Sequence, residues 1–356
     1  MKHIKMIVTL VLVACFMLAM VACGEKNEPK DEAKAEAEYK LGMGIVVGTG
    51  SSKEGNAQVD ATAAAVVTDK DGKIVACRID VAQNKMNVTA GAVEADKTFK
   101  TKMELGDDYN MAKYGKPNVE GGTVKEWYVQ TKAFEQYVVG MTASEVEAIK
   151  TKEVNAHQIA VDEALLNAGC TMQITEFMAA VVKACNDEQG MSFKTAESFT
   201  LGIAAKTAVD SSTKAATATE AGAANMYSDI ACAVVAGGKV IATLNDAIQP
   251  KIAIDAAGIP TPAEFKGTKR ELKEGYNMAA YGKPNVEGGT VKEWYVQSAA
   301  FSNYVLGMTA SEIAGMKTKE VNAHQISVDE ALLNAGCTMQ ITGICAVVAQ
   351  AANNAR

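Results

Sequence analysis

A segment of 67 residues occurs twice in this chain. Residues 109–175 match residues 276–342 at a constant offset of 167, and the two copies differ at only 11 positions. Self-similarity at a fixed period indicates a duplicated structural unit. Upstream the match is looser but still traceable, and it places the two units, repeat 1 and repeat 2, at residues 41–187 and 197–356. The sequence therefore predicts two tandem copies of one fold.

Each repeat begins with a pattern typical of a β-hairpin. Asp71-Gly72 lies between two apolar runs, and a tight-turn dipeptide with such flanks is a strong hairpin signal. On the second arm apolar residues alternate, so we expect one buried face on that strand. The alternating residues are Val75, Cys77, Ile79 and Val81.

Helical patterns follow the hairpin. A broad apolar stripe predicts a helix over residues 124–139. Thr142 and Glu145 have the spacing of a capping box for a second helix, and Thr175 is expected to cap a last one. The residues expected to face inward on that last helix are Phe177, Ala180, Val181 and Ala184. Strands followed by helices predict an α+β fold, in which an antiparallel, hairpin-based sheet has helices packed on one side.

The N-terminus has the features of a bacterial export signal. A basic start precedes an apolar run at residues 6–20, which is shorter than the roughly 20 residues that a membrane-spanning helix needs. The run ends in Met20-Val21-Ala22-Cys23, which resembles a lipobox. We therefore expect residues 1–22 to be a lipoprotein signal peptide, Cys23 to be lipidated, and residues 23–40 to be a charged tether. A plain signal peptide cut elsewhere and an uncleaved anchor are the alternatives.

Composition narrows the possible partners and chemistry. The net charge is −7 and no cluster of Lys and Arg follows the first five residues, so a nucleic-acid partner is not expected. His157 and His324 are the only histidines after residue 3, and neither has neighbouring ligands, so no metal site is predicted. With one histidine in each repeat, we also do not expect a hydrolytic site of the Ser-His-Asp or Cys-His type. Of the six cysteines after Cys23, only Cys170 and Cys337 stand at equivalent positions in the two repeats, which favours buried thiols over a disulfide framework.

A Gly-rich stretch at residues 110–127 allows two interpretations. Tyr109 just before it and Tyr114 and Trp127 within it could flank a flat ring, as could Tyr276, Tyr281 and Trp294 in repeat 2. The alternative, which we favour, is a long surface connection whose Tyr and Trp residues are core anchors.

The end of each repeat resembles a known family. In repeat 1 the sequence VDEALLNAGCTMQITEFMAAVVKA, which begins at Val161, is similar to the C-terminal signature of the bacterial FMN-binding domain family. The hairpin DKDGKIVACRIDV and the helix EWYVQTKAFEQYVVGMT also resemble pieces of that family, in the same order. The resemblance covers most of each repeat and implies an FMN-binding fold.

The resemblance also implies a cofactor site. In the family, a flavin transferase esterifies the phosphate of FMN onto a Thr of this turn, and the matching residues here are Thr171 and Thr338. Gly169, Cys170, Gly336 and Cys337 are the matching neighbours. A departure is that Gln173 and Gln340 stand where the family has a second hydroxyl residue, so both covalent and non-covalent binding stay open.

Together these patterns predict a lipoprotein on the extracytoplasmic face of the bacterial membrane. The resemblance implies that it carries FMN, receives it from a flavin transferase, and exchanges electrons with a membrane redox partner. An electron carrier or binding protein is a better interpretation than an enzyme. The alternative is a non-catalytic binding or scaffolding lipoprotein that keeps the fold without flavin.

Overall fold

The computed structural model describes residues 35–90, 92–94, 97–262 and 264–356. Residues 36–356 form one compact unit, within which both repeats lie. The predicted signal peptide and Cys23 lie outside the described residues. The predicted tether ends too late, because strand β1 begins at Ala37 and Tyr39 stacks on Phe193, 5.5 Å between ring centroids.

The strands of repeat 1 form one antiparallel sheet. Its order is β4-β3-β2-β1-β7, where β7 comes from the segment after repeat 1. The bounds are β1 Ala37–Gly48, β2 Asn56–Asp69, β3 Ile74–Thr89, β4 Ala92–Val93 and β7 Met191–Thr195. The turn at Asp71-Gly72 joins β2 to β3, as the sequence predicts.

The second sheet is built around the long strand β9. It pairs antiparallel with β8, β10 and β11, and β12 pairs with β11. The bounds are β8 Thr200–Val209, β9 Gly222–Ala236, β10 Lys239–Ile248, β11 Lys251–Ile254 and β12 Pro260–Pro262.

Helices and a small hairpin follow the strands in both halves of the chain, in the same order. In the first half they are α1 Lys102–Leu105, η1 Gly106–Tyr109, α2 Met111–Tyr114, α3 Trp127–Tyr137, α4 Ala143–Glu147, β5 Thr151–Val154, β6 His157–Ala160, α5 Glu163–Ala168 and α6 Thr175–Cys185. In the second they are α7 Lys269–Leu272, η2 Lys273–Tyr276, α8 Met278–Tyr281, α9 Trp294–Tyr304, α10 Ala310–Ala314, β13 Thr318–Val321, β14 His324–Ser327, α11 Glu330–Ala335 and α12 Thr342–Asn353.

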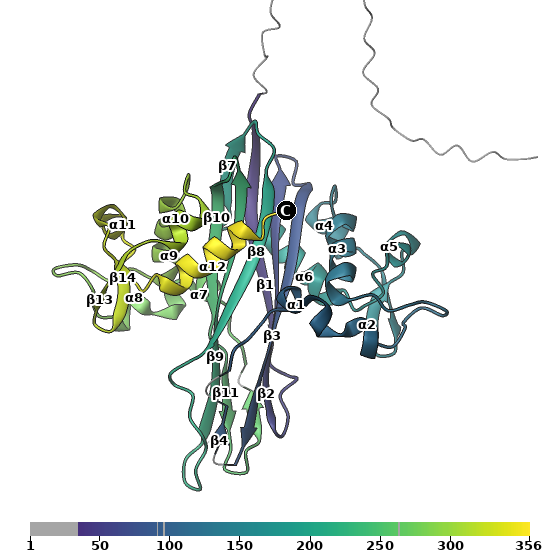
Figure 1. The fold of residues 1–356 in the computed structure, drawn as a ribbon, viewed down its shortest axis with the longest axis horizontal. Coiled ribbons are helices and arrows are strands. Elements are labelled where there is room, and N and C mark those ends of the chain that lie inside the picture. The colour runs from purple at the N-terminus through teal and green to yellow at the C-terminus, as the bar shows by residue number, and fades with distance from the viewer. Residues whose placement is uncertain (1–34, 91, 95–96, 263) are drawn as a thin grey trace, which may run out of the picture. The chain divides into compact units, whose positions relative to one another are not determined.

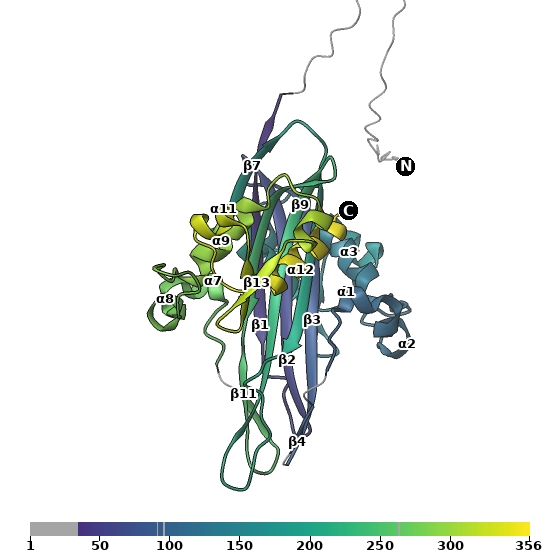
Figure 2. The same cartoon turned by 60° about the vertical axis from the view of Figure 1, so that its left-hand side comes forward.

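The two sheets pack against each other, and the helices cover their outer faces (Figures 1 and 2). Alternate residues of β2, such as Val59 and Val67, belong to a central cluster that also contains Met226 and Leu244 of the second sheet. The residues between them, such as Val66, pack against the helices. Both faces of β2 are therefore buried, and each sheet carries its helices on one side only, as predicted.

Close contact between sheet and helix depends on glycine at matched positions. A Cβ atom on Gly42 of β1 would overlap the carbonyl of Ala184 in α6, and one on Gly202 of β8 would overlap the carbonyl of Ala351 in α12. The missing side chains let these backbones approach each other.

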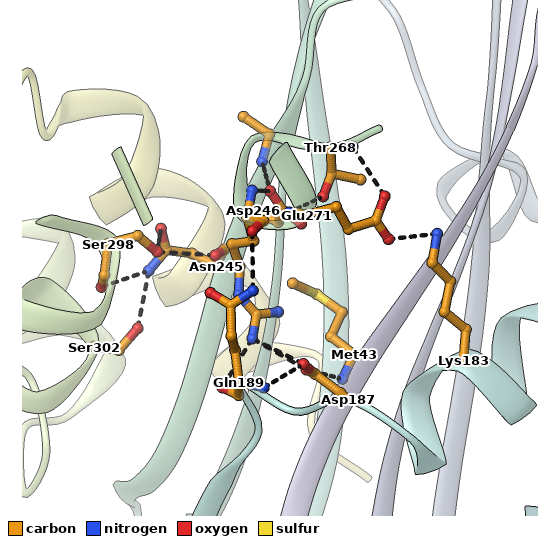
Figure 3. A network of polar contacts seen from close by, with 12 residues as sticks. Met43, Lys183, Asp187, Gln189, Asn245, Asp246, Thr268, Glu271, Ser298 and Ser302 are labelled. Atoms are coloured by element: carbon orange, nitrogen blue, oxygen red, sulfur yellow. Dashed lines mark hydrogen bonds and ion pairs between the residues drawn. The ribbon is translucent and has the colours of Figure 1, made fainter. Parts of the chain in front are cut away.

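The two halves meet at two equivalent junctions, and Figure 3 shows one of them. There Lys183 of α6 pairs with Glu271 of α7. Arg270 donates to both carboxylate oxygens of Asp187, at 3.1 and 3.3 Å, and to the carbonyl of Gln189 at 2.9 Å.

The other junction has different residues at the same positions. At the constant offset of 167, Gln350 and Glu104 replace Lys183 and Glu271, and they form a hydrogen bond of 2.6 Å. Met103 and Asn354 likewise replace Arg270 and Asp187. The contacts between halves thus follow the repeat in position but not in charge.

Two local predictions require correction. Val75 is 37% exposed, because a register shift opposite Val67 and Thr68 makes it a bulge residue and turns Ile74 inward. Thr175 is the first residue of α6 rather than its cap; Ile174 occupies the cap position without a side-chain hydrogen bond.

The other helix predictions are confirmed in whole or in part. The capping box of Thr142 and Glu145 is confirmed, as are the four inward-facing residues of α6. The helix predicted over residues 124–139 is shorter, running from Trp127 to Tyr137.

Candidate functional site

The turn that carries Thr338 is held by buried and semi-buried amide side chains. Helix α11 ends at Gly336, whose φ of 101° is left-handed and therefore suits glycine. The backbone N–H of Thr338 donates to Oε1 of Gln297 at 2.9 Å, and its hydroxyl lies 3.4 Å from the same oxygen. Asn285 Nδ2 donates to the Thr338 carbonyl at 2.9 Å. The turn is thus fixed from both sides.

A hairpin tip supports this arrangement in turn. Asn322, between β13 and β14, donates to Oδ1 of Asn285 at 3.1 Å. The same relay exists in repeat 1, where Asn155, Asn118 and Gln130 hold Thr171 at corresponding distances. Sequence reasoning did not single out these amides, although their identity in both copies could have drawn attention to them.

A cavity of about 500 Å³ adjoins this turn in repeat 2. Thr338, Met339 and Gln340 contribute to its wall, and so do Tyr276 and Trp294 from the Gly-rich region. The volume lies within the range of about 300–1,000 Å³ that is usual for ligand pockets. The structure therefore brings a predicted attachment residue together with two of the aromatic residues that the sequence identified.

Lys269 also lines the cavity, inside a cage of aromatic rings. Its ammonium lies 4.6, 4.7 and 5.6 Å from the ring centroids of Tyr227, Tyr276 and Trp294. Such distances are favourable for cation–π attraction. Trp294 is only 3% exposed, so it acts mainly as a core anchor, as the favoured interpretation expects.

A carboxylate lies under the start of the last helix in both halves, but on different elements. In repeat 1 it belongs to Glu176 of α6, which is 3.4 Å from the Thr62 hydroxyl. In repeat 2, Gly343 replaces Glu176, and Asp229 of β9 fills the space that a side chain there would need. Burial raises the pKa of Asp229 to about 6, although Tyr227 and Lys269 both lower it.

The neighbouring predicted residues have local structural roles. Cys170 and Cys337 are fully buried, and burial raises the pKa of each thiol to about 12. The expectation of buried thiols is confirmed for them. Gly169 and Gly336 both end a helix in the left-handed region, where a lysine packs against them.

The remaining predicted residues lie apart from this core. Tyr114 and Tyr281 are 72% and 86% exposed, and His157 and His324 are exposed, with His324 at the cavity wall. Within the described ranges, no group of three or more potential metal ligands comes together. None of the helices in that part of the chain is long and apolar enough to cross a membrane.

Comparison with protein-family models, curated proteins and solved structures found no match to this chain.

Proposed function

We propose that this chain is a lipid-anchored carrier on the extracytoplasmic face of a bacterial membrane, and that it holds FMN in the cavity of repeat 2. The observation that carries this proposal is the convergence of Thr338, Tyr276, Trp294 and Lys269 on one cavity. A bound flavin would supply one- and two-electron transfer. Cys23 would provide the anchor, a flavin transferase the cofactor, and a membrane protein the electrons.

The residues present fit such a group. The cavity has the volume of a cofactor site, a hydroxyl at its wall and a cation for an anionic group. Gln297 and Asn285 hold the backbone of Thr338 on both sides, so the hydroxyl is presented from a fixed turn. Repeat 1 offers the same turn at Thr171, but Asp60 stands at the position of Tyr227, so the two sites differ in charge.

The test is the intact mass of the mature protein, produced together with a flavin transferase. We expect a gain of one FMN less water, which is lost in Thr338→Ala and kept in the matched control Thr171→Ala. Non-covalent binding would instead give an unmodified mass with flavin released on denaturation. An unmodified mass without released flavin would contradict the proposal.

That last outcome would support a second candidate, a binding or scaffolding lipoprotein that keeps the fold without flavin. The observation that favours it is Gln340, whose exposed side chain stands at the cavity wall where the FMN-binding family has a hydroxyl residue.

A further inference from the structure

Lys269 is held in place by the start of helix α7. Thr268 and Glu271 form a reciprocal capping box, with hydrogen bonds of 3.2 and 3.0 Å, and Lys269 is the first residue inside it. Lys269 is only 7% exposed and lines the cavity of repeat 2. The backbone therefore fixes where this side chain enters the cavity.

Lys269 has no carboxylate in direct contact; the nearby Asp229, whose pKa Lys269 lowers, is hydrogen-bonded to Tyr227 instead. Among the described residues the one hydrogen-bond acceptor of Lys269 is the Tyr227 hydroxyl at 3.4 Å, and no carboxylate there lies within 4.0 Å of its ammonium. An ammonium has three donors, and a lysine this buried is normally paired. Two of its donors are thus free for an acceptor that comes from outside the protein.

The rings around Lys269 define what that acceptor can be. The π faces of Tyr227, Tyr276 and Trp294 stabilise a positive charge but supply no strong acceptor, apart from the Tyr227 hydroxyl. A cationic ligand would be repelled by the ammonium. An anionic group could bind the ammonium through charge-assisted hydrogen bonds, which are stronger than those between neutral groups.

Repeat 1 provides a comparison within the same chain. Lys102 matches Lys269 and lies 5.0 and 5.6 Å from the rings of Tyr109 and Trp127, but it is only partly buried. Asp60 matches Tyr227 by strand register, so the third ring is absent and a carboxylate stands in its place. Only the repeat 2 lysine combines burial, a three-ring cage and a cavity.

We propose that Lys269 binds an anionic group of the ligand directly and makes repeat 2 the anion-selective site of this chain. This inference deepens the proposed function and rests on it for the identity of the ligand. The shared chemistry is a negatively charged oxygen or ring atom, which can belong to a phosphate or to a flavin ring that becomes anionic on reduction.

Calorimetric titration of the full chain tests the inference with FMN, riboflavin and inorganic phosphate as ligands, each flavin in its oxidised and in its reduced form. Loss of one charge-assisted interaction predicts about 10- to 100-fold weaker binding of anionic ligands in Lys269→Met. The matched control Lys102→Met should bind within about twofold of wild type, and Lys269→Arg should recover most of the affinity. Circular dichroism melting shows whether each variant is folded.

The ligands separate the two sources of the anion. A loss confined to FMN and inorganic phosphate assigns Lys269 to the phosphate, and an equal loss for FMN and riboflavin assigns it to the ring. Binding of inorganic phosphate that depends on Lys269, without any flavin binding, would refute the proposed function but support this inference. If folded Lys269→Met binds as wild type does, or if wild type binds none of the three ligands, the inference is overturned.

Discussion

Replacing Arg270 by Met should destabilise the junction between the two halves. Arg270 and Asp187 have side chains that are only 7% and 10% exposed. Removing one partner of a buried ion pair costs about 3–5 kcal/mol, because the remaining charge has lost its counter-ion. Asp187 would keep hydrogen bonds from the backbone N–H groups of Met43 and Gln189, at 3.1 and 2.9 Å. We therefore expect the lower end, about 3 kcal/mol.

The chain itself supplies the compensating change. The other junction carries Met103 and Asn354 at these two positions, so Arg270→Met with Asp187→Asn reproduces a pair that the fold already accepts. The double variant should lie within about 1 kcal/mol of wild type. The second change would therefore restore about 2 kcal/mol of what Arg270→Met costs, a non-additive effect expected for residues that share a contact.

The assay is urea unfolding followed by far-ultraviolet circular dichroism. Lys183→Gln is the matched control, since its pair with Glu271 is 41% and 35% exposed and Gln350 occupies the equivalent position. It should change stability by less than about 1 kcal/mol. The reasoning is refuted if Arg270→Met costs less than about 1 kcal/mol, or if the double variant is no more stable than the single one.

Two further results are expected from buried carboxylates. Burial raises the pKa of Asp80 to about 6, so the folded state holds this proton more tightly than the unfolded chain, and stability should fall as pH rises from about 4 to about 7. Asp80→Asn should make that slope shallower in urea unfolding measured across this range, while Asp229 and Asp246, whose pKa values burial also raises to about 6, keep part of it; an unchanged slope would argue against the assignment. Gly343→Glu should lower the melting temperature, since its Cβ would overlap Asp229, at an overpacking cost of about 1–3 kcal/mol. Adding Asp229→Thr should restore most of the lost melting temperature. If it does not, a carboxylate on helix α12 cannot replace the one on strand β9.

The sequence predicts local elements well because their signals are local. The Asp71-Gly72 turn and the capping box at Thr142 depend on a few neighbouring residues, and both occur as predicted. The prediction that Val75 is buried is wrong because one bulge residue reverses the alternation of the strand. A bulge leaves no signal in the apolar pattern.

The layered packing and the cavity depend on contacts far apart in sequence. Strand β2 is buried on both faces, so its apolar run does not reveal that the second sheet covers one of them. Lys269 lies in a charged stretch of the sequence. Its role could not be predicted, because it depends on a contact with Tyr227, which precedes it by 42 residues. Thr338 was found only because the turn resembles a known motif.

Joining both repeats in one chain removes a restriction that a symmetric homodimer obeys. In a two-fold dimer each residue of one subunit recurs in the other, so every change appears at both equivalent places. Here Arg270 faces Asp187 at one junction, while Met103 occupies the equivalent place at the other. The same freedom lets Lys269 sit in a cage that Lys102 lacks. Duplication within a single polypeptide thus allows one half to specialise while its twin continues to support the common core.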